Sequence, residues 1–305
     1  MHQPVMLREV VNFLNINSQG IYIDGTVGSG GHAEAILSRL SNGGKLIGID
    51  RDIEAIERAK KRLSCYGKKV HLVHARYEEM EKIVMTLGLA EIDGILIDTG
   101  VSSEQLETPE RGFSFLHNGP LDMRMDRSDG ISAADIVNNY DEKDLISIFK
   151  NFGEERYAVK IARAIVKERC NNPITETAKL AEIVENVVGR REKIHPATRI
   201  FQALRIAVNN ELEGLKKGLE AGLKLLKSGG RIVVITFHSL EDRIVKQVFL
   251  KHAVKKEALP EGGIWKNFEE PPVRIITKHV IKASEEEIEI NPRSRSAKLR
   301  VAERI

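Results

Sequence analysis

A glycine-rich loop after the first strand-like stretch is the first feature that could bind a ligand. Residues 24–32 read Asp-Gly-Thr-Val-Gly-Ser-Gly-Gly-His and lie between an apolar stretch and a helical pattern. Gly28, Gly30 and Gly31 let the backbone turn tightly and approach a ligand without a Cβ in the way. Parallel α/β sheets bind nucleotides at loops that join a strand to a helix in this manner. We therefore predict a nucleotide-containing cofactor here, with a plain tight turn as the structural alternative.

The loop alone does not identify the cofactor, because its spacing Gly-x-Gly-x-x-Ala fits NAD as well as S-adenosylmethionine. Asp50 ends the second predicted strand and can accept hydrogen bonds from the ribose hydroxyls of either cofactor; a helix N-cap is its alternative role. Asp24 favours S-adenosylmethionine, since a carboxylate can hold an ammonium group and would repel a pyrophosphate. Residues 226–230, Leu-Lys-Ser-Gly-Gly, resemble the entry to the fifth strand of class I methyltransferases and favour the same cofactor.

A polar string after the fourth predicted strand supplies the candidate catalytic residues. Asp98, Ser102 and Ser103 fall at the sheet edge where a substrate would meet the cofactor. The exocyclic amine of cytosine or adenine is a weak nucleophile, because its lone pair is delocalised into the ring. A carboxyl oxygen and backbone carbonyls could orient the amine toward a methyl donor, and orientation supplies ~7–11 kcal/mol without a strong base. A capped turn is the structural alternative.

The elements that position these residues alternate between strands and helices. Apolar stretches predict strands at 20–24, 45–50, 70–75, 92–98, 231–237, 274–282 and 298–302, and helical periodicity predicts helices at 33–40, 53–63, 78–87 and 209–227. The strands are too apolar to face water on one side, which indicates a parallel sheet with helices on both faces. The predicted fold class is α/β: a Rossmann-like, mostly parallel sheet of the class I methyltransferase type. Residues 255–272 are expected to form a surface loop.

A long interruption of this pattern predicts an inserted domain. The 110 residues between Asp98 and Asn209 far exceed the ~2–6 of an ordinary connection. Helical periodicity continues at 141–151, 154–170, 175–188 and 198–208. We predict a discontinuous methyltransferase domain at 1–105 and 208–305, with an inserted helical domain at 106–207.

Composition excludes several classes of protein. The chain has 305 residues, 42% hydrophobic and 30% charged, with a net charge of +3, which is typical of a soluble globular protein. The longest apolar runs are far short of the ~20 residues that span a bilayer, and the first residues do not resemble a secretory signal. Cys65 and Cys170 are expected to be reduced thiols in the cytoplasm. No metal site is predicted, because His71 and His74 alternate along one strand.

A series of strings resembles one family closely, the bacterial 16S ribosomal RNA cytosine-N4 methyltransferases known as RsmH or MraW. The strings lie, nearly end to end, at 2–9, 28–32, 49–52, 98–103, 111–115, 119–126, 153–156, 195–199, 201–205, 237–243 and 291–296. Among them are Gly-Pro-Leu-Asp-Met-Arg-Met-Asp at 119–126 and Phe-His-Ser-Leu-Glu-Asp-Arg at 237–243. So many strings in one order leave little room for coincidence.

The resemblance implies methyl transfer from S-adenosylmethionine to a cytidine in the decoding region of the small ribosomal subunit. Its partner would be small-subunit rRNA or the assembled subunit. The positions that bind S-adenosylmethionine in the family fall here on Gly30, Gly31, His32, Asp50, Tyr77, Asp98 and Gln105. Tyr77 could pack against the adenine. Thr99 departs from the leucine expected there, which should perturb packing more than chemistry.

A basic stripe in the insert is the candidate RNA-binding surface. The side chains that fall on one face of the predicted helix 154–170 are Arg156, Lys160, Arg163 and Lys167. Such a ridge suits sequence-independent phosphate contacts, although a solvated helix face is the alternative. Residues 150–210 carry twelve Lys or Arg and seven Asp or Glu, a local surplus of +5. Arg199 in this stretch, and Arg293 and Arg295 in a basic tail, are further candidates.

A base buried in RNA must be turned out to reach a methyl donor, and an aromatic side chain could stack on it. Phe113 and Phe115 are preferred, because they follow the active-site strand, and a core role is equally open. The other candidates are Phe201, Phe237 and Trp265. Methyl transfer needs no histidine, so His195 and His238 are expected to make structural hydrogen bonds.

Two other functions compete with a methyltransferase. An NAD-dependent oxidoreductase could use the same glycine loop, but no proton-relay pair is evident after the fourth strand. A ribosome-assembly factor could keep the fold for binding only, but the cofactor residues are intact.

Overall fold

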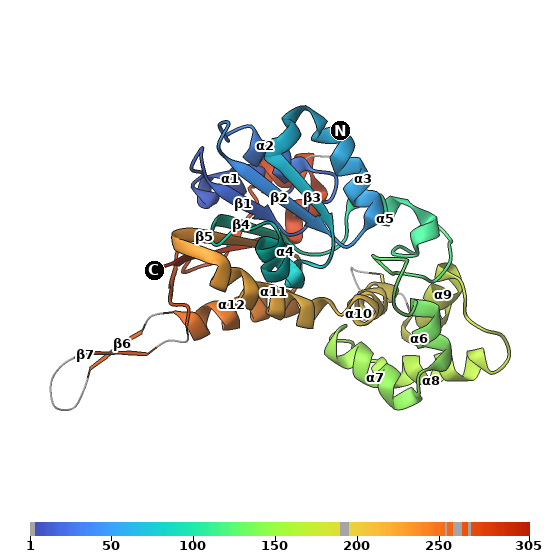
Figure 1. Cartoon of the computed structure of the whole chain (residues 1–305). Coiled ribbons are helices and arrows are strands. Elements are labelled where there is room, and N and C mark those ends of the chain that lie inside the picture. The colour runs from blue at the N-terminus through green and yellow to red at the C-terminus, as the bar shows by residue number, and fades with distance from the viewer. Residues whose placement is uncertain (1–3, 190–194, 254, 259–263, 268–269) are drawn as a thin grey trace. The chain divides into compact units, whose positions relative to one another are not determined.

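The chain divides into two compact units (Figure 1). The computed structural model describes residues 4–189, 195–253, 255–258, 264–267 and 270–305. Residues 1–100 and 212–305 form one unit, here called the sheet unit, and residues 101–211 form the other, here called the insert. The predicted boundaries, after 105 and before 208, lie close to this division.

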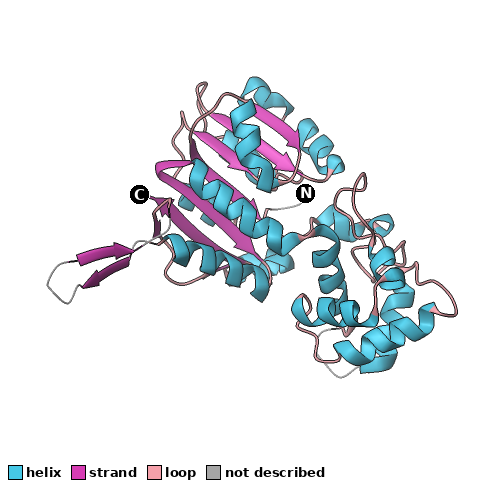
Figure 2. Ribbon diagram, turned by 60° about the horizontal axis from the view of Figure 1, so that its bottom comes forward, coloured by secondary structure: helices cyan, strands magenta, loops and turns pink. Residues whose placement is uncertain are grey.

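One mixed sheet organises the sheet unit (Figure 2). Its strands in the described residues are β1 Ile21–Asp24, β2 Lys45–Asp50, β3 Val70–His74, β4 Ile92–Asp98, β5 Leu226–Thr236, β8 Val273–Ile275, β9 Ile281–Lys282 and β10 Lys298–Arg304. They lie in the order β3-β2-β1-β4-β5-β10-β8, with β9 beside β10. The predicted single strand at 274–282 is thus two short strands, β8 and β9.

The direction of the strands fixes where a ligand can bind. The strands from β3 to β5 are parallel, whereas β10 runs antiparallel to β5 and to β8. The strand order reverses between β1 and β4, and open α/β sheets bind ligands at the carboxyl ends of the strands beside such a reversal. Because Lys298 pairs with Thr236, the chain enters β10 at this same edge of the sheet.

Alternate strand residues feed an apolar core on each face of the sheet. Tyr22 and Leu96 pack on one face with α1, α2 and α3, while Ile23 and Ile95 pack on the other with α4, α11 and α12. The helices are α1 Leu7–Leu14, α2 Gly31–Leu37, α3 Ile53–Arg62, α4 Met80–Thr86, α11 Glu211–Leu225, α12 Ser239–His252 and α13 Glu285–Ile290. Short 3-10 helices are η1 Ser64–Lys69, η2 Tyr77–Glu79, η3 Pro109–Arg111 and η4 Pro292–Ser296. This two-sided burial explains why the strands are almost wholly apolar.

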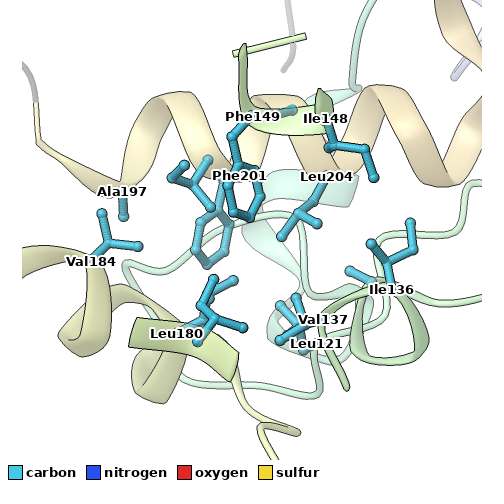
Figure 3. Close-up of a cluster of buried hydrophobic side chains, with 14 of the residues drawn as sticks. Leu121, Ile136, Val137, Ile148, Phe149, Leu180, Val184, Ala197, Phe201 and Leu204 are labelled. Atoms are coloured by element: carbon cyan, nitrogen blue, oxygen red, sulfur yellow. The ribbon is translucent and has the colours of Figure 1, made fainter. Parts of the chain in front are cut away.

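The insert is helical and has its own core. Its helices are α5 Ser103–Glu107, α6 Ala133–Asn139, α7 Glu142–Asn151, α8 Ala158–Arg169, α9 Thr177–Val188 and α10 Ala197–Asn209. Phe149, Leu180, Phe201 and Leu204 meet at its centre (Figure 3). The four predicted helices correspond to α7 to α10, whereas α5 and α6 were not predicted.

Several predicted boundaries are wrong. The helix predicted from residue 154 begins at Ala158, after Glu154 adopts a left-handed φ of 48°. The loop predicted at 255–272 contains an antiparallel pair, β6 Lys255–Ala258 and β7 Ile264–Asn267. Strand β5 begins at Leu226, so the glycines expected to end the preceding helix lie within the strand, where its register to β4 shifts. In the part of the chain that is described, no helix has the length and apolar character to cross a membrane.

Candidate active site

The glycine loop is tied to the strands on both sides of β1. The N–H of Gly25 donates to the carbonyl of Leu96 on β4 at 2.8 Å, and that of Val27 to the carbonyl of Ile49 on β2 at 2.9 Å. Gly28 and Gly30 have φ values of +53° and +83°, which side chains with a Cβ rarely adopt. The loop therefore has a fixed path at the strand reversal, and glycine is required there for backbone reasons alone.

Asp50 holds this loop rather than capping a helix. Its carboxylate accepts the N–H of Gly28 at 2.8 Å and the N–H of Asp52 at 2.9 Å. The N-cap of α3 is Asp52, which accepts the N–H of Glu54 at 3.0 Å. Burial raises the pKa of Asp50 to about 6, against the opposite effect of its two N–H donors. The helix-cap alternative for Asp50 is wrong.

Asp24 is a buried carboxyl group with one unsatisfied oxygen. The residue is 1% exposed, and its Oδ1 accepts the N–H of Thr26 at 3.2 Å. Its Oδ2 has no hydrogen-bond partner among the described residues. The pKa of Asp24 is raised to about 7, chiefly by burial. The Thr26 N–H opposes this rise, and the nearby charge of Asp50 adds to it.

Asp98 repeats this arrangement at the end of β4. The backbone N–H of Asp98 donates to Thr26 Oγ1 at 2.7 Å. The Asp98 side chain is 22% exposed, and its Oδ1 has no hydrogen-bond partner in the described part of the chain. Burial raises the pKa of Asp98 well above its usual range, and the charges of Asp24 and Glu241 add to this effect.

These carboxyl groups form an acidic site that fits a cationic ligand. Leaving a buried acceptor unsatisfied costs about 1–3 kcal/mol, so two such oxygens beside one loop indicate that a ligand supplies the missing donors or positive charge. In the residues described, no three His, Cys, Asp or Glu side chains are grouped as metal ligands. An organic cation such as S-adenosylmethionine, with its ammonium and sulfonium groups, matches this donor set, whereas a pyrophosphate would be repelled.

Tyr77 begins the 3-10 helix η2 that follows β3. A Cβ built on Gly218 of α11 would lie 2.4 Å from its ring, and one built on Gly25 would lie 3.2 Å from the Tyr77 Cβ. Tyr77 therefore packs on α11 and reaches the start of the glycine loop. This location suits the predicted contact with an adenine, which stays a prediction.

Ser102 and Gln105 form a capping box at the start of α5. Ser102 Oγ accepts the N–H of Gln105 at 3.2 Å, and Gln105 Oε1 accepts the N–H of Ser102 at 3.0 Å. The capped turn that was the structural alternative for this string is thus present. Ser103 is buried, and its Oγ has no hydrogen-bond partner among the described residues, so it keeps a hydroxyl available. We therefore assign Ser102 a structural role as the N-cap of α5.

Thr99 and the histidines make structural contacts. Thr99, which stands where leucine is expected, donates its hydroxyl to the carbonyl of Ile235 on β5 at 3.1 Å. The polar atom of this buried side chain therefore has a hydrogen-bond partner. His238 caps α12, accepting the N–H of Glu241 at 3.4 Å. His195 accepts the N–H of Ala197 at 3.2 Å. Structural hydrogen bonds for both histidines are confirmed.

The two preferred stacking residues belong to the core of the insert. Phe113 is buried there, and Phe115 packs on it, with its ring stacked on His195 at 4.4 Å and edge-on to Phe201 at 4.9 Å. Phe201 is buried, and Phe237 is partly buried beside the sheet core. The side chain of Trp265 lies outside the described residues. The core role that was left open for Phe113 and Phe115 is thus present, and stacking on a base stays a prediction.

The basic stripe is exposed, as its spacing predicts. Lys160, Arg163 and Lys167 lie exposed on α8, while Ala158 and Ile161 are buried on its other side. The remaining residue of the stripe, Arg156, is exposed but precedes the helix. Arg163 forms an ion pair with Glu142 of α7 at 3.1 Å.

Sequence reasoning missed an aromatic side chain within this stripe. The cations of Arg156 and Lys160 lie 5.8 Å and 6.0 Å from the ring centre of Tyr157. An aromatic side chain among basic side chains is a combination that proteins use to bind single-stranded nucleic acid. The available signal in the sequence was a tyrosine directly after Arg156, near the start of the predicted helix.

The other basic candidates differ in exposure. Arg199 lies 3.8 Å from the buried carboxylate of Glu155, which gives it a structural role. Arg295 is exposed and Arg293 half-buried on η4, at the sheet edge where Asp98 lies. Residues 190–194, which contribute to the basic surplus of residues 150–210, lie outside the described residues.

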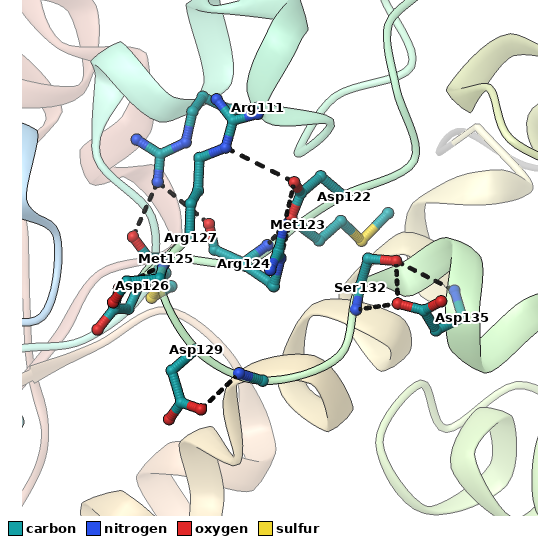
Figure 4. A network of polar contacts seen from close by, with 12 residues as sticks. Arg111, Asp122, Met123, Arg124, Met125, Asp126, Arg127, Asp129, Ser132 and Asp135 are labelled. Atoms are coloured by element: carbon teal, nitrogen blue, oxygen red, sulfur yellow. Dashed lines mark hydrogen bonds and ion pairs between the residues drawn. The ribbon is translucent and has the colours of Figure 1, made fainter.

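A polar network in the insert was also missed (Figure 4). Asp122 accepts two hydrogen bonds from the Arg124 side chain, at 2.8 Å and 3.0 Å, and Arg111 donates to the carbonyls of Arg124 and Met125. Met123, buried with a φ of 63°, shows that this loop is held in an unfavourable conformation. The string at 119–126 marked the loop, but its contacts depend on tertiary structure.

The fold and the site together define a class of protein. Antiparallel β10 between β5 and β8, after five parallel strands, is the sheet of class I methyltransferases, and the acidic glycine-loop site lies at its strand reversal.

Comparison with known proteins identifies the family. Residues 1–305 match the model of the MraW methylase family. A protein of Carboxydothermus hydrogenoformans named ribosomal RNA small subunit methyltransferase H is 49% identical, with 100% of this chain and 98% of that protein covered. Proteins of the same name from Caldicellulosiruptor bescii and Geobacter sulfurreducens are each 48% identical, with 100% of this chain and 99% of each protein covered. The chain belongs to the MraW methylase family.

Proposed function

We propose that this chain transfers a methyl group from S-adenosylmethionine to the N4 amine of a cytidine in the decoding region of small-subunit rRNA. The observation that carries the proposal is the end-to-end match, at 49% identity, to a small-subunit rRNA methyltransferase, combined with an acidic site suited to a cationic cofactor. The partner is small-subunit rRNA or the subunit itself, and the reaction takes place in the cytoplasm.

The cofactor would be held by the loop and the strand ends around it. The proposed loop glycines are Gly28, Gly30 and Gly31. A Cβ built on Gly28 would meet only the Thr26 carbonyl, at 3.9 Å, which leaves room for a ligand there, and His32 follows the glycines at the start of α2. Asp50 would accept hydrogen bonds from the ribose and Asp24 would hold the ammonium group. Tyr77 and Gln105 complete the proposed set. When bound, S-adenosylmethionine supplies an electrophilic methyl group on a cationic sulfur.

Asp98 would position the acceptor amine. Its unsatisfied Oδ1 can accept an N4 hydrogen of cytosine, which aims the weakly nucleophilic nitrogen at the methyl group. Orientation of this kind lowers the barrier without a strong base. Ser103, with its buried hydroxyl, is the second candidate for this role, and Ser102 supports the turn.

RNA would be held by exposed basic side chains. Lys160, Arg163 and Lys167 on α8, with Arg156 before it, offer phosphate contacts that do not depend on sequence. Arg293 and Arg295 are further proposed contacts, because η4 precedes β10 at the sheet edge where β4 and β5 end.

Two measurements test the proposal. Calorimetry of the wild-type protein should detect S-adenosylmethionine binding and no NAD binding. Methylated cytidines in small-subunit rRNA should then be mapped in cells that lack the gene and carry either the wild-type gene or Asp50→Ala. The wild-type gene should restore one N4-methylated cytidine and Asp50→Ala should not, since it removes the carboxylate that ties β2 to the loop. Unchanged methylation without the gene would reject the proposed substrate.

The two competing functions receive no support. An NAD-dependent oxidoreductase would place a pyrophosphate beside Asp24, where burial already disfavours one negative charge. A purely non-catalytic assembly factor would have no reason to keep buried carboxyl oxygens unsatisfied at the cofactor loop.

A further inference from the structure

Residues Pro4–Met6, within the first motif string at 2–9, lie against the start of α2 beside the cofactor loop. A Cβ built on Gly31 would lie 2.4 Å from Pro4 Cγ, so the proline ring packs directly on this glycine. The carbonyl of Val5 lies 2.9 Å from His32 Nε2. Nothing in the cofactor role of the glycine loop explains why this segment is fixed here.

The segment is anchored at its other end as well. Met6 is fully buried, has a left-handed φ of 52°, and donates its N–H to Glu287 Oε1 of α13 at 2.6 Å. Left-handed backbone is unfavourable for methionine and persists only where the surroundings enforce it. Glu287 and the packing of Met6 therefore hold the segment in a defined position over the loop.

His32 connects this segment to Asp98. A carbonyl can only accept, so His32 Nε2 must carry the hydrogen that bonds Val5. The other ring nitrogen, Nδ1, then faces Asp98, with 3.7 Å between it and Oδ2. His32 is 7% exposed, so the ring has little freedom to turn away. The contacts run from Glu287 through Met6 and Val5 to His32, and from there to the carboxyl group that has the unsatisfied Oδ1.

We propose that His32 is a positioning residue for methyl transfer: the Val5 carbonyl fixes its ring, and its Nδ1 sets the direction in which Asp98 presents Oδ1 to the acceptor amine. Residues Pro4–Met6 are thereby part of the active site. The inference rests on the proposed function, because it assigns Asp98 the role of orienting the amine.

Two substitutions test the roles of the two ring nitrogens of His32 separately. In His32→Gln the amide nitrogen can reach the Nε2 position and keep the bond to Val5, but nothing replaces Nδ1. In His32→Asn the amide can occupy the Nδ1 position beside Asp98, while the bond to Val5 is lost. At saturating RNA and S-adenosylmethionine, kcat should fall about tenfold or more in His32→Gln and be partly retained in His32→Asn. The calorimetric affinity for S-adenosylmethionine, measured on both variants, separates any loss of cofactor binding from the loss of kcat.

The anchor is tested on the ligand-free protein. Glu287→Ala should speed amide hydrogen exchange across residues 4–10 and lower kcat severalfold, whereas Glu286→Ala, on the exposed side of α13, should do neither. A His32→Gln enzyme with wild-type kcat, or one whose loss lies wholly in cofactor affinity, would overturn the positioning role. Equal behaviour of the Glu287 and Glu286 variants would overturn the role of the segment. Absence of rRNA methylation by the wild-type protein would instead reject the proposed function, and the exchange measurement does not depend on it.

Discussion

Asp24 and Asp98 are the residues whose environment says most about function. Each is a carboxyl group withdrawn from water, and each keeps one oxygen without a donor among the described residues. Burial raises the pKa of both, so the ligand-free site is short of positive charge. Perturbed carboxyl groups that converge on one loop are typical of functional sites.

The affinity for S-adenosylmethionine should depend on pH in a defined direction. The pKa of Asp24 is raised to about 7 and that of Asp50 to about 6, so both groups bind protons in the ligand-free protein below neutral pH. A cation binds the ionised site, and its binding must release those protons. The dissociation constant should therefore fall as pH rises from about 5.5 to about 7.5, by up to tenfold per unit for each proton released. Calorimetry in buffers of different ionisation enthalpy measures both the dissociation constant and the number of protons released.

The control is Asp24→Asn, which should bind more weakly and lose most of this pH dependence. Whereas cofactor affinity should rise with pH, the free energy of unfolding of the ligand-free protein should fall over the same range. An Asp whose pKa rises from 3.8 to about 7 on folding contributes stability at low pH, and that contribution is lost as pH rises through the folded-state pKa. A dissociation constant that does not vary between pH 5.5 and 7.5 would show that these carboxyl groups do not meet the cation.

At the residue scale, the sequence identified site residues by their position at strand ends, but it did not identify the residues with which charged side chains interact. Asp24, Asp50 and Asp98 could be found because each ends an apolar strand, and parallel strands end at one edge. The basic tail was harder to interpret, because Arg300 forms an ion pair with Asp242 at 2.6 Å and Arg304 donates to carbonyls at the end of α11. Sequence spacing shows a charge but not which partner the fold brings to it.

Among the elements, α8 shows how one helix can serve packing and binding together. Its buried side chains Ala158, Ile161, Ala162 and Ile165 belong to the core of the insert. Its exposed cations stand on the opposite side, where they contribute little to stability, because exposed ion pairs contribute about 0–1 kcal/mol. The packing of α8 therefore does not depend on these cations, which are the proposed phosphate contacts.

Reversing the charge of Lys160, Arg163 and Lys167 to Glu should weaken RNA binding and leave cofactor affinity unchanged. Each lost phosphate contact should lower the slope of log affinity against log salt by about 0.9 for duplex-like and about 0.7 for single-stranded RNA. A titration of small-subunit rRNA fragments at several salt concentrations measures this slope. The matched control reverses Lys216, Lys217 and Lys224, three exposed lysines of α11. Equal loss in the two triple variants would mean that net charge, not the α8 surface, governs binding.

The loop at 119–126 should depend on one buried amide. Asn209, at the end of α10, accepts the N–H of Met125 at 2.8 Å and donates to the carbonyls of Met123 and Arg205. Asn209→Ala should lower the free energy of unfolding by about 2–3 kcal/mol, because it leaves buried backbone groups unsatisfied. Chemical denaturation measures this loss. Asn151→Ala removes an exposed amide of α7 and should change stability by less than about 0.5 kcal/mol.

The elements that sequence predicted well are those with long, regular periodicity. Helices α7 to α10 have 10 to 13 residues and an apolar face, and each was expected. Helix α6 has 7 residues and depends on the capping box of Ser132 and Asp135, so periodicity gives little signal. The β6–β7 pair was missed because prolines and glycines around it favour a loop.

At the scale of the whole molecule, the chain consists of two units with separate cores. The apolar clusters of the sheet unit, on the two faces of the sheet, and the cluster of the insert share no residue. The net charge of +3 averages over the surplus of +5 at residues 150–210 and a slight excess of acidic residues in the rest of the chain. The chain is a sheet unit interrupted by the insert, which agrees with the predicted discontinuous domain.

Separate cores predict separate unfolding, and only one unit should respond to the cofactor. Calorimetric heating of the full-length protein should show two transitions, because each unit has its own apolar core. S-adenosylmethionine at about 100 times its dissociation constant should stabilise the sheet unit by about 2.7 kcal/mol, and move that transition alone. Asp24→Asn should reduce the shift, while Asn209→Ala should lower the other transition. A single transition that moves as a whole with cofactor would mean that the two units unfold cooperatively, and that the insert is stabilised through the cofactor-binding unit.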